Sequence, residues 1–140
     1  MVEMLIATAI TGLIVGVLGT AVFQVTDVSQ YGNDRLTAMH ELQNIARWFN
    51  LDGQRAVSAT VDGDLSLKIS ESLTITYTVN GTELRRIAGS SQMTLARNIS
   101  SASFSSANRT VTLTVTSSPE GRHNINEQGS YKVTLRPSGE

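Results

Sequence analysis

The feature that most constrains this chain is an uncharged apolar run near its N-terminus, from Met4 to Thr26. The run reads MLIATAITGLIVGVLGTAVFQVT, and Gln24 is its one strongly polar side chain. At about 1.5 Å of rise per residue, a helix of this length covers the ~30 Å hydrocarbon core of a bilayer. A helix of a soluble domain keeps a polar stripe, whereas this run is apolar on every side. The sequence therefore predicts a helix surrounded by lipid or by other helices.

A cleaved secretory signal is the main alternative for this run. Signal sequences have an apolar stretch of about 7–15 residues after a basic segment. Here the apolar run is longer, and Glu3 stands where Lys or Arg would be expected. Ala7-Thr8-Ala9 fits a small-x-small cleavage site, but it lies inside the run instead of after it. We therefore favour a helix that is retained.

Small residues recur every four positions within the run, at Thr8, Gly12, Gly16 and Thr20. On a helix they form one strip, and Gly12-x-x-x-Gly16 is a close-packing motif of membrane helices. Glycine is also common in membrane helices without such a contact, and each glycine weakens a helix by ~1 kcal/mol in water. We interpret the strip as a helix-packing surface.

Glu3 is an acidic residue directly before the apolar run. Such a carboxylate is costly in a membrane unless it lies at the interface or is paired. An interfacial Glu at a helix start is equally reasonable, because the helix dipole favours a negative charge there. The residues alone leave both interpretations open.

The segment Val2-Glu3-Met4-Leu5-Ile6-Ala7, with the apolar run after it, resembles the N-terminus of type IV pilins and type II secretion pseudopilins. Mature chains of that family begin Phe-Thr-Leu-Val/Ile-Glu. Met1 then takes the Leu position, Val2 the next, and Glu3 the position of the family's glutamate. The resemblance implies that Glu3 acts in filament assembly by pairing with the N-terminal amine of a neighbouring subunit. Such pairing would offset the desolvation of both charges.

The chain departs from the family pattern at its start. The Gly of the processing site and the first two mature residues are absent, so the site for the prepilin peptidase is missing. We hypothesise a truncated gene start, in which a Leu codon is read as Met1. The upstream DNA would then encode a short basic leader that ends in Gly-Phe-Thr.

Helical spacing continues after the apolar run. Residues 27–59 are expected to form an amphipathic continuation of the helix, with a possible kink at Gly32-Asn33 and an end between Asp52-Gly53 and Ala56. Its predicted apolar face consists of Leu36, Met39, Leu42, Ile45, Ala46 and Phe49. Trp48 and Phe49 are expected to pack on a sheet.

Residues 60–140 are expected to form a β-rich head. Alternating apolar residues predict strands at 65–69, 73–79, 83–88, 102–105, 111–115 and 130–135, with Asn80-Gly81 as a hairpin turn. Residues 93–99 are interpreted as a link and 117–129 as a polar loop. The expected fold class is α+β: a long N-terminal α-helix, with an apolar first half at 1–26 and an amphipathic second half, packed on a small antiparallel β-sheet head. This arrangement is pilin-like.

The sequence suggests no chemistry. There is no Cys, which excludes disulfides and thiolate metal sites. The formal net charge of -1 offers no basic face for nucleic acid. His40 and His123 are the only histidines. His40 is interpreted as a solvated side chain of the helix, His123 is placed in a polar loop with Arg122 and Glu127, and Asp62-Gly63-Asp64 is interpreted as a plain turn. We therefore expect no catalytic, cofactor or metal site, no direct nucleic-acid binding and no enzymatic activity.

The resemblance implies a structural subunit of a type IV pilus or type II secretion pseudopilus, of the minor or accessory kind. Such filaments serve adhesion, motility, DNA uptake or secretion. The expected partners are other pilin-like subunits, membrane lipid before assembly, and the prepilin peptidase. The N-terminus would be cytoplasmic and the head extracytoplasmic. The alternative is a membrane-anchored extracellular binding module that does not polymerise.

Overall fold

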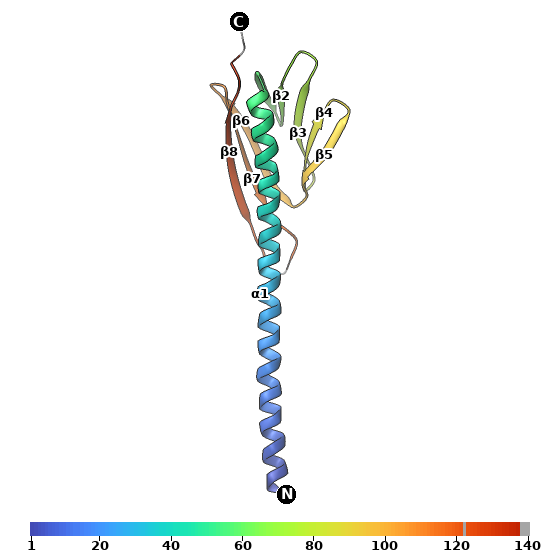
Figure 1. Cartoon of the computed structure of the whole chain (residues 1–140), viewed down its shortest axis with the longest axis vertical. Helices are drawn as coiled ribbons and strands as arrows, with labels where there is room; N and C mark the ends of the chain where they lie inside the picture. The colour runs from blue at the N-terminus through green and yellow to red at the C-terminus, as the bar shows by residue number, and fades with distance from the viewer. Residues whose placement is uncertain (122, 138–140) are drawn as a thin grey trace. The chain divides into compact units, whose positions relative to one another are not determined.

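The computed structural model describes residues 1–121 and 123–137. Figure 1 shows one long helix, α1 (Val2–Arg55), followed by eight strands. These are β1 (Ser58–Asp62), β2 (Asp64–Lys68), β3 (Thr74–Asn80), β4 (Glu83–Ala88), β5 (Ser91–Ala96), β6 (Ile99–Ala107), β7 (Thr110–Ser117) and β8 (Glu127–Thr134). The chain forms two compact units, Met1–Asn33 and Asp34–Glu140.

The first unit is helical, as the apolar run predicts. Leu, Ile, Val and Ala in this run are compatible with a helix once lipid or packing replaces water, although its glycines are weak helix formers. By length and composition α1 can cross a membrane, and none of its most apolar window is buried within the chain. The helical backbone continues through Gly32-Asn33, where the sequence indicated a possible kink.

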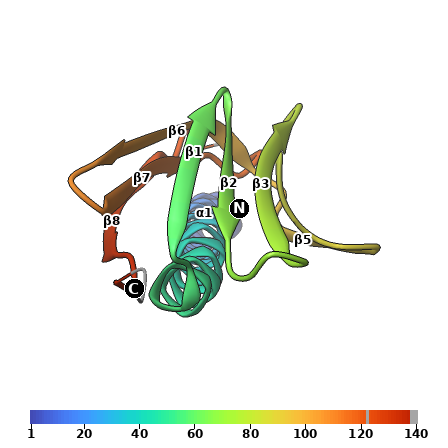
Figure 2. The ribbon, with the colours of Figure 1, turned by 90° about the horizontal axis from the view of Figure 1, so that it is seen from above.

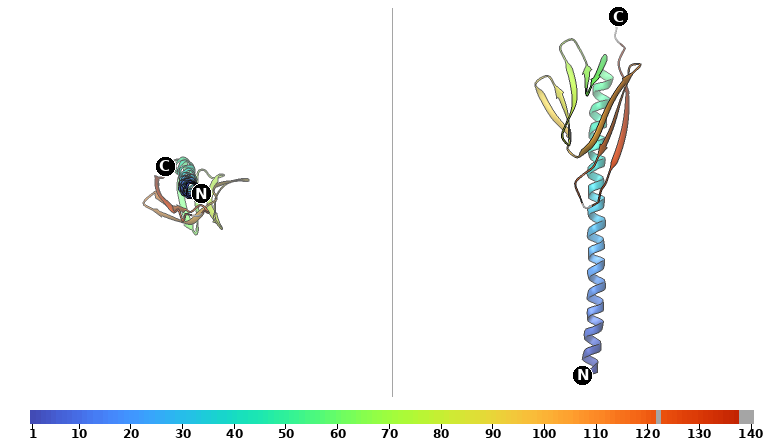
Figure 3. Two further views of the ribbon diagram at one scale, coloured as in Figure 1. Left: turned by 90° about the horizontal axis from the view of Figure 1, so that it is seen from below. Right: turned by 180° about the vertical axis from the view of Figure 1, so that it is seen from behind.

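The second unit packs strands around the later residues of α1. One sheet has the order β1-β2-β3-β4-β5 and the other β6-β7-β8, and all neighbouring strands are antiparallel. Figure 2 shows the two sheets curving over this part of α1, with β1 beside β6, and the right view of Figure 3 shows them from behind. The predicted α+β class is confirmed, although the strands divide between two sheets where one was expected.

The core of the second unit lies between the helix and the inner faces of both sheets. Alternate residues of each strand face inward because the side-chain period of a strand is two. The buried apolar side chains include Leu65, Leu67, Ile75, Tyr77 and Leu84 from the first sheet, Val111, Leu113, Val115 and Val133 from the second, and Ala38, Leu42, Ile45 and Phe49 from α1. Burying each large one contributes about 1.5–3 kcal/mol.

The buried stripe of α1 differs from the predicted one at its start. Leu36 is 53% exposed and Ala38 is fully buried. At 100° per residue, Ala38 continues the line of Leu42, Ile45 and Phe49, whereas Leu36 falls on the far side. The prediction for Leu36 was therefore wrong, because it followed the spacing of apolar residues alone and did not include which side of the helix faces the sheets.

Several element boundaries also differ from the predicted ones. The helix ends at Arg55, within the predicted range, and β1 begins at Ser58, two residues before the predicted start of the head. The expected link at 93–99 contains part of β5, and the expected polar loop is shorter because β8 begins at Glu127. The apolar alternation in these segments is short, with two residues in β1 and in β5 and none at residues 127–130. They become strands through pairing with β2, β4 and β7, which local propensity does not predict.

Tight turns join most of the strands. The β3–β4 loop is Gly81-Thr82, one residue later than predicted, since Asn80 pairs with Glu83 and Gly81 has φ 62°. Glycine at the first loop position suits a hairpin turn of this kind. Asp62-Gly63-Asp64 is the plain turn that the sequence predicts, with Gly63 at φ 73°.

Candidate functional site

The most unusual surface of the molecule is the lateral face of α1 in the first unit. Large apolar side chains here are more than half exposed: Val2, Met4, Leu5, Ile6, Ile10, Leu13, Ile14, Val15, Val17, Leu18, Val22, Phe23, Val25 and Val28. A soluble monomer rarely exposes a continuous apolar area of this extent, and such areas mark membrane or protein contacts. We therefore take this surface, named the apolar rod (residues 2–28), as the candidate functional site.

The threonine hydroxyls of the apolar rod bond to the helix itself. Thr8 Oγ1 donates to the carbonyls of Met4 and Leu5, both at 3.0 Å. Thr11, Thr20 and Thr26 donate in the same way one turn back, at 2.8–3.0 Å. A hydroxyl without a partner is costly to move into an apolar medium. These hydroxyls keep their hydrogen bonds when the rod leaves water, so the transfer of the rod into an apolar medium has little desolvation cost from them.

The predicted packing residues Thr8, Gly12, Gly16 and Thr20 are all exposed on this rod. A Cβ added at Gly12 or Gly16 would meet no other atom of the chain within 4 Å. Gly19 is equally open and lies seven residues after Gly12, hence on the same side of the helix. The sequence analysis missed Gly19 because it followed only the four-residue repeat. The spacing of seven would have found it.

Glu3 lies in the first turn of α1 and is exposed. Its carboxylate has no hydrogen bond or ion pair with any residue that the structure describes. The position at the helix start is one that the helix dipole favours for a negative charge. The single chain thus leaves the carboxylate open to a partner outside it.

A second group of polar residues holds α1 in the head, and the sequence analysis did not identify it. Asp52, on the last turns of α1, has a side chain only 1% exposed. Its Oδ2 accepts hydrogen bonds from Arg86 Nε at 2.6 Å and Tyr77 OH at 2.5 Å, and its Oδ1 accepts from Arg86 Nη2 at 2.9 Å. This paired fork is the strongest form of side-chain hydrogen bonding between charged groups.

Aromatic rings surround this buried ion pair. The Arg86 guanidinium lies 4.8 Å from the ring centre of Trp48, and Phe49 meets Tyr77 edge-on at 6.2 Å. Burial, and then the Asp52 carboxylate, raise the pKa of Tyr77, while the hydrogen bond to Asp52 raises the pKa of Arg86. Trp48 and Phe49 therefore pack on the sheet as predicted.

Glu41 ties the same helix to the other sheet. Its Oε1 accepts hydrogen bonds from the Asn98 side chain at 2.8 Å and the Arg97 backbone at 3.1 Å. Its Oε2 accepts from Ser117 Oγ, on β7, at 2.7 Å. One turn away, Asn44 Nδ2 donates to the Leu95 carbonyl at 2.8 Å. Polar contacts thus fix α1 against both sheets.

The other residues considered in the sequence carry no evident chemistry. His40 is exposed and His123 is partly buried. On β4, where the sequence analysis did not predict a charge pair within the chain, Arg85 forms an ion pair with Glu83 at 2.6 Å. Among residues 1–121 and 123–137, no group of three His, Cys, Asp or Glu side chains is placed to hold a metal ion.

Comparisons with known proteins gave no assignment. No protein-family model matches the chain, and neither the curated proteins nor the solved structures yield a match.

Proposed function

We propose that this protein is a structural subunit of a helical filament of the type IV pilus or type II secretion kind, and that the apolar rod anchors it in a membrane before assembly. The observation that carries the proposal is the exposed helix of the first unit, which has no charged residue from Met4 to Thr26. The resemblance of the first residues to pilins and pseudopilins gives the class of filament.

Energetics support burial of the rod in lipid or among like helices. Each exposed Leu, Ile, Val or Phe gains about 1.5–3 kcal/mol when it leaves water, and more than a dozen are present. The hydroxyls add little cost because they bond to their own backbone. The same surface suits both a bilayer and the core of a helical bundle, so one segment serves before and after assembly.

Glu3 is the residue that favours a filament subunit over a simple membrane anchor. A carboxylate at the start of the rod, without a partner among residues 1–121 and 123–137, suits the N-terminal amine of a neighbouring copy. Within an apolar bundle such a pair is kept together by the cost of leaving either charge alone. In this proposal the N-terminus is cytoplasmic and the head is extracytoplasmic.

A Glu3→Ala variant tests the proposal. In cells that carry the assembly machinery, we expect the variant to insert into the membrane like the wild type but to be absent from sheared filaments. Glu71→Ala is a matched control, because it removes an exposed carboxylate from the head. If Glu3→Ala assembles as well as the control, the proposed role of Glu3 is wrong. If the wild type does not enter filaments, the protein is a membrane-anchored module that does not polymerise.

A further inference from the structure

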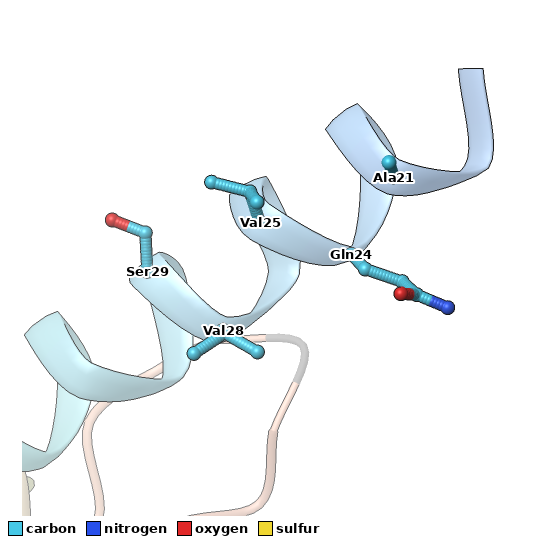
Figure 4. Close-up of a pocket in the computed structure, with 5 residues that line it drawn as sticks. All are labelled: Ala21, Gln24, Val25, Val28 and Ser29. Atoms are coloured by element: carbon cyan, nitrogen blue, oxygen red, sulfur yellow. The ribbon is translucent and has the colours of Figure 1, made fainter. Parts of the chain in front are cut away.

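Four residues near the C-terminal end of the apolar rod frame a shallow hole in the helix surface. Ala21, Gln24, Val25 and Val28 are spaced i, i+3, i+4 and i+7, and Ser29 lies at the rim (Figure 4). This is the four-residue arrangement that receives one side chain of a facing helix in knobs-into-holes packing.

Gln24 makes this hole different from the rest of the rod. Its side chain is exposed, and no residue in the described parts of the chain bonds to it. The neighbouring threonines, in contrast, bond to backbone carbonyls one turn back. An amide brought into an apolar layer without a partner costs several kcal/mol. A membrane position would therefore favour any neighbour that offers both a donor and an acceptor.

We propose that this hole is the contact surface of a parallel pair of two copies of α1, in which the two Gln24 amides bond to each other. An amide has both donors and an acceptor, so it is complementary to its own copy. Copies inserted with the same polarity also present Gln24 at the same depth, which a two-fold pair requires. The inference rests on the proposed membrane anchorage of the rod and describes the state before assembly.

The hole is separate from the small-residue strip. At 100° per residue, Ala21, Val25 and Val28 lie on the side of the helix opposite Gly12 and Gly19. A pair formed through the hole therefore leaves the glycines open. The two surfaces allow a helix to have a pairing partner on one side and a closely packed neighbour on the other.

A cysteine scan of the full chain tests the orientation of the pair. The natural chain has no Cys, so each single substitution introduces the only thiol. In phosphatidylcholine–phosphatidylglycerol vesicles with an oxidant, we expect the highest disulfide yield for Ala21→Cys, Val25→Cys and Val28→Cys. Gly19→Cys and Phe23→Cys, on the other side, should give the lowest. Equal yields at all positions, or the reverse pattern, would overturn the proposal.

Substitution of the amide tests the chemistry of the contact. Self-association is measured by energy transfer between labelled full-length copies in the same vesicles. Gln24→Leu should weaken it about 3- to 30-fold, which is the range for the loss of a hydrogen bond between membrane helices. Ala21→Leu fills the hole and should weaken it as well. Phe23→Leu is the control at the same depth and should have no effect.

Two results separate this inference from the proposed function. If Gln24→Leu associates as well as the wild type while the chain stays in the vesicles, Gln24 contacts lipid headgroups and the pairing inference fails alone. If the wild-type chain does not stay in the vesicles, the membrane anchorage itself fails.

Discussion

At the scale of single residues, the buried pair of Asp52 and Arg86 is the contact that most strongly fixes α1 in the head. Asp52→Ala would leave the Arg86 guanidinium, 13% exposed, without its carboxylate. Removing one partner of a buried pair costs about 3–5 kcal/mol. We expect a loss of this order in the free energy of unfolding, measured by urea titration in detergent. Glu83→Ala removes the carboxylate of the more exposed Arg85 pair and should cost only ~0–1 kcal/mol.

Equal losses in Asp52→Ala and Glu83→Ala would contradict this ranking. The two variants are matched because each removes a carboxylate that bonds to an arginine of β4. They differ in the burial of that carboxylate, and Asp52→Ala also removes the hydrogen bond from Tyr77.

Tyr77 makes the stability of the head sensitive to alkaline pH. Its pKa is raised in the folded state, chiefly by burial and then by the Asp52 carboxylate. Above about pH 10 the unfolded chain loses the tyrosine proton while the folded chain keeps it, so stability falls as pH rises. Below that pH the contribution is complete. Tyr77→Phe should flatten the fall measured by denaturant titration between pH 9 and pH 11.

The stability of the Tyr77→Phe variant should still fall somewhat at alkaline pH, because burial also raises the pKa of Tyr131. At neutral pH, Tyr77→Phe should be destabilised by about 1.5–3 kcal/mol, since it loses a hydrogen bond to a charged group. A variant as stable as wild type at neutral pH and equally sensitive at high pH would show that the Tyr77–Asp52 bond is unimportant.

At the scale of elements, Gly53 sets how closely α1 approaches β8. A Cβ at this position would overlap the Val133 side chain, with Cγ2 only 2.7 Å away. Gly→Ala inside a helix usually stabilises by ~1 kcal/mol. Here we expect the opposite sign, a loss of about 1–3 kcal/mol from overpacking, measured by thermal unfolding of the full chain. Gly32→Ala, which meets nothing within 4 Å, should cause no loss.

At the scale of the whole molecule, the two units should behave differently in water. The unit Asp34–Glu140 has its own core, whereas the apolar rod exposes its side chains. We expect a fragment that begins at Asp34 to be a folded monomer without detergent, by light scattering and circular dichroism. The full chain should pellet or form large particles under the same conditions. A monomeric full chain in plain buffer would contradict the function proposed above.

The apolar rod, its continuation as a helix and the α+β class are predictable from the residues alone. These follow from local rules: a long uncharged run has no polar face to show to water, and alternation of apolar residues marks strands such as β3 and β7. Phe49 on the core and the turn at Gly63 were predictable for the same reason.

Contacts between distant segments determine which strands share a sheet, which side of α1 is buried and which polar residues hold it. Asp52 and Arg86 are 34 residues apart, and Glu41 and Ser117 are 76 apart. Nothing in the local pattern around any of these four residues indicates its partner. Their pairing depends on how the backbone brings distant segments together, because a buried charge requires a partner and only the folded chain determines where that partner lies.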